Sequence, residues 1–304
     1  MRNTPSQETR SDVYQRITDA LVQQLEQGTR PWMKPWNAEH LAGKITRPLR
    51  HNGQPYRGIN VLMLWLTAVE RGYAAPIWMT FKQALDLESH VRKGEKGTPV
   101  AYADTITRTD QESEEEREIW FMKQYTVFNV EQIDGLPPHF HAHAAPTIAP
   151  DARIAHAEAF FQATGAKVGH GGNRAYYRHS DDVIQMPPFE AFHDPESYYA
   201  TLAHECVHWT RHASRLDRTF DQKRFGDEGY AREELVAEIG SAFLAADLGL
   251  YLEPREDHAA YLASWLQILK NDKRAVFVAA SFAQKATDFL LQLQPAGQEE
   301  RAAA

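Results

Sequence analysis

The chain has 304 residues, of which 43% are hydrophobic, and its formal net charge is −8. This length is enough for one large hydrophobic core or two moderate ones and favours two domains, while the net charge gives no support to a nucleic-acid partner for the chain as a whole. The single cysteine, Cys206, excludes an internal disulfide framework, and no apolar segment suits a signal peptide or a membrane span, so we expect a cytoplasmic protein without a membrane partner.

The N-terminal part combines helical and extended patterns. Apolar residues at a helical period, bounded by capping residues or glycines, predict three helices: 11–28, 58–72 and a short one after residue 80. Alternating patterns over 100–107 and 119–130 predict a β-hairpin, with an acidic loop at its tip that we expect to be solvated.

A proline-rich segment without periodicity, residues 134–150, is typical of a linker. We therefore expect an N-terminal α+β domain over residues 1–135, a linker over 136–150 and a second domain over 151–304. His139, His141 and His143 alternate in this segment, but three ligands from one flexible strand rarely suffice to hold a metal. We interpret them as exposed linker histidines.

The second domain is predicted to be mainly helical with a small sheet. Two short strands are expected near 175–179 and 182–187, after a glycine-rich turn at 169–173. Helical periodicity covers most of the remaining sequence, over 151–164, 195–212, 228–248, 256–270 and 273–293. The expected fold class of the whole chain is α+β.

The helix over 195–212 carries the motif His-Glu-x-x-His. Asp194 is a good N-cap and Pro195 suits the first helical position, so the helix is predicted independently of the motif. His204 and His208 are four residues apart and lie on one helix face, where both rings can reach one metal ion. Glu205 is offset by one residue, as expected for the general base of a metallopeptidase.

A third protein ligand is expected on the helix over 228–248, because a catalytic zinc site needs three ligands and an open position. Glu234 and Glu238 share one face of that helix. We favour Glu234 as the ligand and Glu238 as the acceptor for the other N–H of a ligand histidine, with the reverse assignment as an alternative. A second alternative is that both are surface acids, although the adjacent apolar residues direct this helix towards a core.

The expected metal is Zn²⁺, with Mn²⁺ as the alternative. It would lower the pKa of a bound water, and Glu205 would take the proton during attack on a peptide carbonyl. Candidate donors to the developing oxyanion are Tyr176, Tyr177 and Tyr230. The strands near 175–179 and 182–187 offer an edge along which a substrate peptide can bind.

Several segments resemble the ArdC-type antirestriction proteins of conjugative plasmids, which are related to the N-terminal part of TraC-type primases. The resemblance spans nearly the whole chain and is carried by DVYQRITDALVQQLEQGTRPWMKPW, PYRGINVLMLW, VRKGEKGTPV, TLAHECVHWTRHASRLDR and REELVAEIGSAFLAADLGL. It implies an N-terminal single-stranded-DNA-binding domain, a C-terminal zincin-like metallopeptidase domain, and protection of incoming plasmid DNA from host restriction. It also places the metal positions on His204, His208 and Glu234.

The charge distribution agrees with a DNA-binding N-terminal part. Between residues 27 and 103, 11 lysines and arginines face five acids, a net charge of +6 in a chain of −8. Cations alternate with aromatic residues there, as in grooves that hold single strands. The predicted DNA-binding residues are Arg30, Trp32, Lys34, Trp36, Tyr56, Arg57, Asn60, Trp78, Lys82, Arg92, Lys93 and Lys96. The alternative is that the tryptophans belong to the core and the lysines are merely solvated.

Two functional hypotheses remain at this point. In the first, the protein binds single-stranded DNA and cleaves a host protein, such as a restriction component, at the His204–Glu205–His208 site. In the second, it is a non-catalytic DNA-binding shield whose metal site is structural or vestigial. The intact Glu205 favours the first hypothesis, because a structural metal has no need of that carboxylate.

Overall fold

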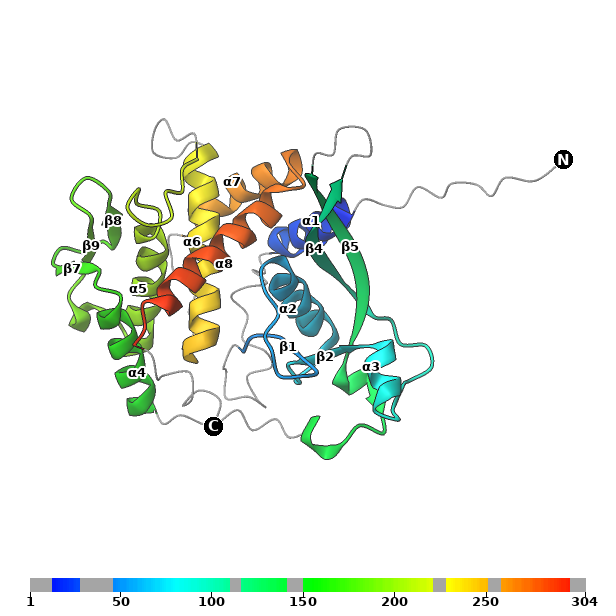
Figure 1. The fold of residues 1–304 in the computed structure, drawn as a ribbon. Helices are drawn as coiled ribbons and strands as arrows, with labels where there is room; N and C mark the ends of the chain where they lie inside the picture. The colour runs from blue at the N-terminus through cyan, green and yellow to red at the C-terminus, as the bar shows by residue number, and fades with distance from the viewer. Residues whose placement is uncertain are drawn as a thin grey trace.

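The computed structural model describes residues 13–27, 46–109, 116–140, 150–220, 228–250 and 258–295. The chain is an α+β protein, as predicted, in which helices and three small sheets alternate (Figure 1). The α-helices are α1 (Val13–Glu26), α2 (Ile59–Arg71), α3 (Phe81–Asp86), α4 (Pro150–Ala163), α5 (Pro195–Trp209), α6 (Glu228–Leu248), α7 (His258–Asn271) and α8 (Ala275–Gln292). The strands are β1 (Leu49–Arg50), β2 (Ile77–Thr80), β3 (His90–Val91), β4 (Thr98–Thr109), β5 (Glu116–Asn129), β6 (Ile133–Asp134), β7 (Lys167–His170), β8 (Tyr176–Arg178) and β9 (Val183–Met186).

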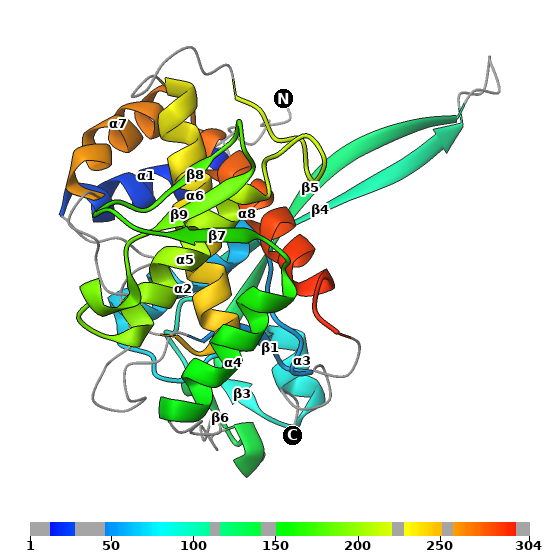
Figure 2. The ribbon, with the colours of Figure 1, turned by 90° about the vertical axis from the view of Figure 1, so that its left-hand side faces the viewer.

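The N-terminal half is built on a sheet with the strand order β1-β2-β5-β4. The predicted hairpin is confirmed, and its strands pair from Thr98 opposite Val127 to Thr109 opposite Glu116. Figure 2 shows this hairpin extending well beyond the rest of the molecule. The Asn60 side chain ties α2 to β4, because it accepts from the Ala101 N–H at 2.8 Å and donates to the Ala101 carbonyl at 2.7 Å.

The C-terminal half surrounds α6, which is buried along most of its length (Figure 1). This burial explains why the α6 sequence is apolar on more than one face. Helices α5, α7 and α8 pack against it, and the small sheet β7-β9-β8 lies beside α5. Within this sheet β8 pairs antiparallel with β9 and forms an edge, whereas β7 pairs parallel with β9.

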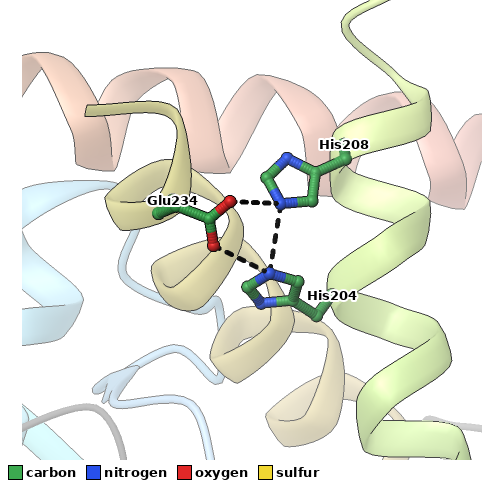
Figure 3. A group of neighbouring side chains, drawn as sticks. All are labelled: His204, His208 and Glu234. Atoms are coloured by element: carbon green, nitrogen blue, oxygen red, sulfur yellow. Dashed lines mark hydrogen bonds and ion pairs between the residues drawn. The ribbon is translucent and has the colours of Figure 1, made fainter. Parts of the chain in front are cut away.

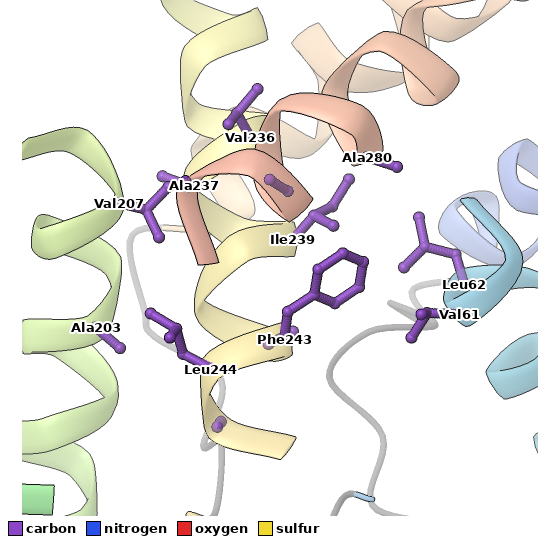
Figure 4. Close-up of a cluster of buried hydrophobic side chains, with 14 of the residues drawn as sticks. Val61, Leu62, Ala203, Val207, Val236, Ala237, Ile239, Phe243, Leu244 and Ala280 are labelled. Carbon is purple, nitrogen blue, oxygen red and sulfur yellow. The ribbon is translucent and has the colours of Figure 1, made fainter. Parts of the chain in front are cut away.

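One hydrophobic core joins the two halves. Val61 and Leu62 of α2 lie in the same cluster as Phe243 of α6 (Figure 4), and the Trp65 ring contacts Phe243 edge-on with centroids 5.9 Å apart. The buried Arg47 guanidinium adds a bidentate ion pair to Asp247, at 2.8 and 2.9 Å. These contacts fix the position of α6 relative to the N-terminal half.

A glycine allows α5 and α6 to approach closely. A Cβ atom at Gly240 would lie 2.8 Å from a γ-carbon of Val207, which is closer than side chains pack. Val207 and Ala203 of α5 face α6 in the core (Figure 4). The small residue at position 240 therefore brings the motif-bearing helix against the helix that carries the predicted third ligand.

The structure differs from the sequence-based expectation at several elements, among them the short strands β1, β2, β3 and β6, which were not predicted. Strand β7 was not predicted, because its four residues pair in parallel with a distant strand and carry no alternation. The predicted linker is structured at its start: β6 pairs with β3, and Leu136 and Phe140 are buried in a small cluster around α3. Helix α5 ends at Trp209 and not at residue 212. His139 is exposed as predicted, whereas His141 and His143 lie outside the described residues.

None of the helices in the described ranges combines the length and the apolar content that a membrane-spanning helix requires.

Candidate metal centre

The centre lies between α5 and α6. The predicted start of α5 is confirmed: Asp194 caps the helix by accepting from the Ser197 N–H at 2.7 Å, and Pro195 occupies its first turn. His204 and His208 are one turn apart and point towards α6, where Glu234 faces them (Figure 3). All three side chains are buried. The close approach of α5 and α6 at Gly240 brings the two histidines within reach of Glu234.

The ligand atoms of these three residues converge on one point. The Nε2 atoms of His204 and His208 are 3.1 Å apart, and the two oxygens of Glu234 lie 3.4 Å from one Nε2 atom each. A tetrahedral zinc ion with bonds of about 2.0–2.1 Å holds its ligand atoms about 3.3–3.4 Å apart. The three side chains therefore fit a divalent metal ion with no change larger than a small side-chain rotation. Two histidines and a glutamate are also a donor set found in zinc peptidases.

A carboxylate stands behind each of the two histidines. Glu238 lies 3.3 Å from Nδ1 of His204, in the supporting position expected for it. Glu233 lies 3.1 Å from Nδ1 of His208, which the sequence analysis did not predict. Such partners fix which nitrogen carries the proton and which one faces the metal. The Glu233 hydrogen bond orients His208 with Nε2 towards the shared point, and Glu238 lies within ion-pair distance of the corresponding nitrogen of His204.

Glu233 is itself held by a buried arginine. Arg218, from the segment after α5, donates to both carboxylate oxygens of Glu233 at 2.7 and 2.8 Å, and its side chain is 0% exposed. The same guanidinium donates to the Val207 carbonyl and to the Thr210 hydroxyl, which anchors it to the end of α5. Arg218 was not predicted as a site residue, because it lies in a loop with no periodic pattern. The only signal in the sequence is its place at the end of the segment TLAHECVHWTRHASRLDR, which carries part of the family resemblance.

The electrostatics of this cluster favour a cation. Burial raises the pKa of Glu233, but the hydrogen bonds from Arg218 and His208 outweigh it and lower that pKa to about 2. Glu234 likewise has its pKa held well below the ordinary value, because the two histidines overcome the effect of burial. Burial lowers the pKa of His208, yet the charges of Glu234 and Glu233 raise it to about 10. The site therefore concentrates negative charge around two imidazoles, an environment that a bound divalent ion neutralises.

A cavity of about 150 Å³ opens onto this cluster. Glu205 lines it together with the two histidines and Glu234. The cavity is far smaller than the roughly 300–1,000 Å³ of pockets that enclose drug-sized ligands. It has room for a metal ion and a few small groups.

All three candidate tyrosines line the same cavity. The Tyr177 hydroxyl already donates to Asp182 at 2.9 Å, and burial with this carboxylate raises its pKa to about 12. Tyr176 is 43% exposed on the edge strand β8, and Tyr230 lies at the start of α6. The Tyr177 hydroxyl is therefore committed to Asp182, whereas the Tyr176 side chain is exposed at the edge of the sheet. Arg211, which was not predicted, lines the cavity as well.

Those predicted DNA-binding residues that lie in the described ranges are not gathered in one place. Trp78 is 0% exposed and Tyr56 is 3% exposed, so neither ring has a free face on which a base can stack. The structure assigns these two rings to packing, which corrects the prediction. Asn60 has its amide engaged by Ala101. Arg30, Trp32, Lys34 and Trp36 lie outside the described residues.

The remaining predicted cations are on the surface. Lys82, Lys93 and Lys96 are exposed. Arg92 is partly committed to the fold, because it pairs with Glu95 at 2.9 Å and donates to the Glu131 carbonyl at 2.6 Å. Arg57 forms an ion pair with Asp288 of α8, a contact between the two halves that the sequence did not indicate.

Two family models match the chain. Residues 11–128 match the N-terminal domain of anti-restriction factor ArdC, and residues 155–282 match a zincin-like metallopeptidase. Among curated proteins, the chain is 41% identical to uncharacterized protein y4eC of Sinorhizobium fredii, over 93% of this chain and 92% of that protein. It is also 38% identical to DNA primase TraC of Escherichia coli, over 94% of this chain but only 28% of the primase.

Solved structures give the same result. The metal-free crystal structure of antirestriction ArdC protein from plasmid R388 matches with a TM-score of 0.79 and 50% identity, over 93% of this chain and 98% of that one. The Mn(II)-bound structure of the same protein matches with a TM-score of 0.79 and 46% identity, over 94% and 100% of the two chains. The likeness therefore covers both halves and their arrangement.

Proposed function

The chain belongs to the ArdC family of antirestriction proteins, and on that premise we propose that it protects incoming plasmid DNA by binding single strands and cleaving a host protein at the α5–α6 site. The observation that carries the peptidase part is the convergence of His204, His208 and Glu234 beside Glu205 in one cavity. Residues 1–135 and 151–304 are the proposed DNA-binding and peptidase domains. The buried, single Cys206 suits action in a reducing cytoplasm.

His204, His208 and Glu234 would hold the metal, with Glu233 and Glu238 orienting the two rings. A divalent ion in such a site supplies Lewis acidity, which acidifies water and polarises a carbonyl group. We propose Zn²⁺ because two imidazoles and one carboxylate are a donor set that suits zinc, with Mn²⁺ as the alternative that the ArdC structure from R388 contains.

Glu205 is the proposed general base. It would accept the proton of the attacking water and deliver it to the leaving amine, which is the role that its place in the cavity allows. Tyr176 and Tyr230 would donate to the oxygen of the substrate carbonyl. The small size of the cavity and the edge position of β8 support a substrate bound in extended form along β8, with its scissile bond over the cavity.

Antirestriction during conjugative transfer tests the proposal. Glu205→Gln preserves the size and polarity of the side chain but removes the base, and Glu190→Gln, at an exposed position in the same half, is the matched control. We expect Glu205→Gln to keep its metal content and its affinity for single-stranded DNA but to lose protection, while Glu190→Gln protects like the wild type.

Full protection by Glu205→Gln would support the second functional hypothesis, a non-catalytic shield. If Glu205→Gln retains metal and protects fully, the protein acts as a DNA-binding shield and the peptidase proposal is wrong. A charge reversal of the exposed Lys93 and Lys96 to Glu examines the DNA part separately, because it leaves the α5–α6 site untouched.

A further inference from the structure

A second cavity, larger than the one at the metal centre, lies elsewhere in the part of the chain that the structure describes. It measures about 780 Å³ and lies where α2 and the base of the β4–β5 hairpin meet α1 and α8. Figure 1 shows the first half of α8 next to α1 and β4. Its floor is fixed by the buried Gln284 of α8, whose side-chain oxygen accepts from the Gly58 N–H and from Arg47, both at 3.1 Å. The cavity is therefore preformed and draws on both halves of the chain.

Cations line this cavity far more than acids do. Arg50 and Arg57 come from the N-terminal half, and Arg274 and Lys285 flank or lie on α8, whereas Asp288 is the one carboxylate in the lining. Asp288 pairs with Arg57. Within the described ranges no carboxylate forms an ion pair with Arg50, Arg274 or Lys285. A concentration of exposed positive charge in a chain of net charge −8 points to an anionic ligand.

Aromatic rings alternate with these cations. Tyr102 of β4 is 48% exposed in the cavity, and Tyr14, Tyr125, Phe277 and Phe282 are half-buried around it. The Arg274 guanidinium lies 5.2 Å from the centre of the Tyr14 ring, and the Lys285 ammonium lies 5.6 Å from that of Phe282. These contacts hold the cations beside flat apolar surfaces. Grooves that bind single strands use the same combination, with phosphates on the cations and unstacked bases on the rings.

We propose that this cavity binds a segment of single-stranded DNA, and that α8 of the C-terminal half supplies part of the binding surface. The inference rests on the proposed function, but it moves the DNA site from residues 1–135 alone to the junction of the two halves. A duplex fits this combination less well, because its bases are stacked inside and are not available to the rings. DNA bound here would contact elements that share one hydrophobic core with the α5–α6 site.

The test measures binding of fluorescein-labelled oligo(dT) of about 20 nucleotides to the full chain, by anisotropy, between about 50 and 200 mM salt. Arg274→Glu combined with Lys285→Glu is expected to weaken binding at least about tenfold. It should also flatten the slope of log affinity against log salt by about 1.4, since each phosphate contact with a single strand contributes about 0.7. The matched control, Lys167→Glu with Arg174→Glu, makes the same charge change at exposed sites of the small β7–β9 sheet region and should bind like the wild type.

Tyr102 tests stacking without a change of charge. Tyr102→Ala should weaken binding by about tenfold, whereas Tyr102→Phe keeps the ring and should remain within about twofold of the wild type. Thermal unfolding of each variant shows whether it folds. If wild type fails to bind oligo(dT), the DNA part of the proposed function is wrong. If wild type binds but the α8 and Tyr102 variants bind equally well, the DNA site lies elsewhere. Equal binding of an RNA strand or of a duplex of the same length overturns the assignment to single-stranded DNA.

Discussion

Replacement of Arg218 by Met tests how the metal centre is held together. This substitution removes a guanidinium that is 0% exposed and leaves the carboxylate of Glu233, 2% exposed, without its main partner. Two hydrogen bonds of 2.7 and 2.8 Å are lost, together with those to Val207 and Thr210. A methionine fills much of the same volume, so the loss is of charge pairing more than of packing.

The expected cost follows from burial. Removal of one partner of a buried ion pair destabilises a protein by about 3–5 kcal/mol, because the other charge remains desolvated. In a chain of this size each kcal/mol lowers the melting temperature by about 2–4 °C, so a drop of about 6–20 °C is expected. Glu233 also orients His208, and the loss of such an outer partner lowers metal affinity by about 10- to 100-fold.

Thermal unfolding followed by circular dichroism, with a chelator present, measures the first effect, and calorimetric titration with zinc measures the second. Glu233→Met and the double variant complete a double-mutant cycle. The double variant should be less destabilised than the sum of the two single variants, because it leaves no unpaired buried charge. Arg178→Met, which breaks an exposed pair with Asp181, is the control and should cost at most about 1 kcal/mol.

An Arg218→Met variant that melts within about 2 °C of the wild type and binds zinc with unchanged affinity would refute this reasoning. It would mean that Glu233 is protonated or solvated in the folded protein and does not position His208.

Three other predictions concern the framework around the sites. Gly240→Ala should lower the free energy of unfolding by about 1–3 kcal/mol, because the new methyl group would lie 2.8 Å from Val207. In urea unfolding, the additional substitution Val207→Ala should restore part of this loss. A Gly240→Ala variant that is more stable than the wild type would contradict the close packing of α5 and α6. The pKa of Asp182 is lowered from 3.8 mainly by the hydrogen bond from Arg215. The ionised carboxylate therefore stabilises the folded protein above pH 3.8, and this stabilisation is lost as the pH falls through the lower pKa of the folded state. The melting temperatures of the wild type and of Asp182→Asn should differ at neutral pH and converge in acid. Asn60→Ala removes both bonds between α2 and Ala101 and should cost about 1–3 kcal/mol in urea unfolding, whereas unchanged stability would show that water replaces them.

Much of the metal centre could be read from the sequence because the information is local. The cap at Asp194, the proline after it and the four-residue spacing of His204 and His208 all act within a few turns of one helix. The same periodicity predicted a helix over about 228–248, where α6 lies, and placed Glu234 and Glu238 on one face. Fold class and family are confirmed. The roles of Glu205 and of the ligands stay predictions, although the geometry fits them.

Contacts between segments far apart in the chain decided the rest. Whether a tryptophan beside lysines stacks on bases or fills a core depends on what packs over it, and Trp78 proved to be fully buried. The ion pair of Arg218 with Glu233 joins a loop to a helix, and no pattern in either segment predicts it. The cavity between α2, α8 and the base of the hairpin forms only because the two halves share one core. That packing brings Arg274 and Lys285 into the same cavity as Tyr14 and Tyr102. Periodicity encodes which face of an element is apolar, but the choice of partner for that face is made only when the whole chain packs.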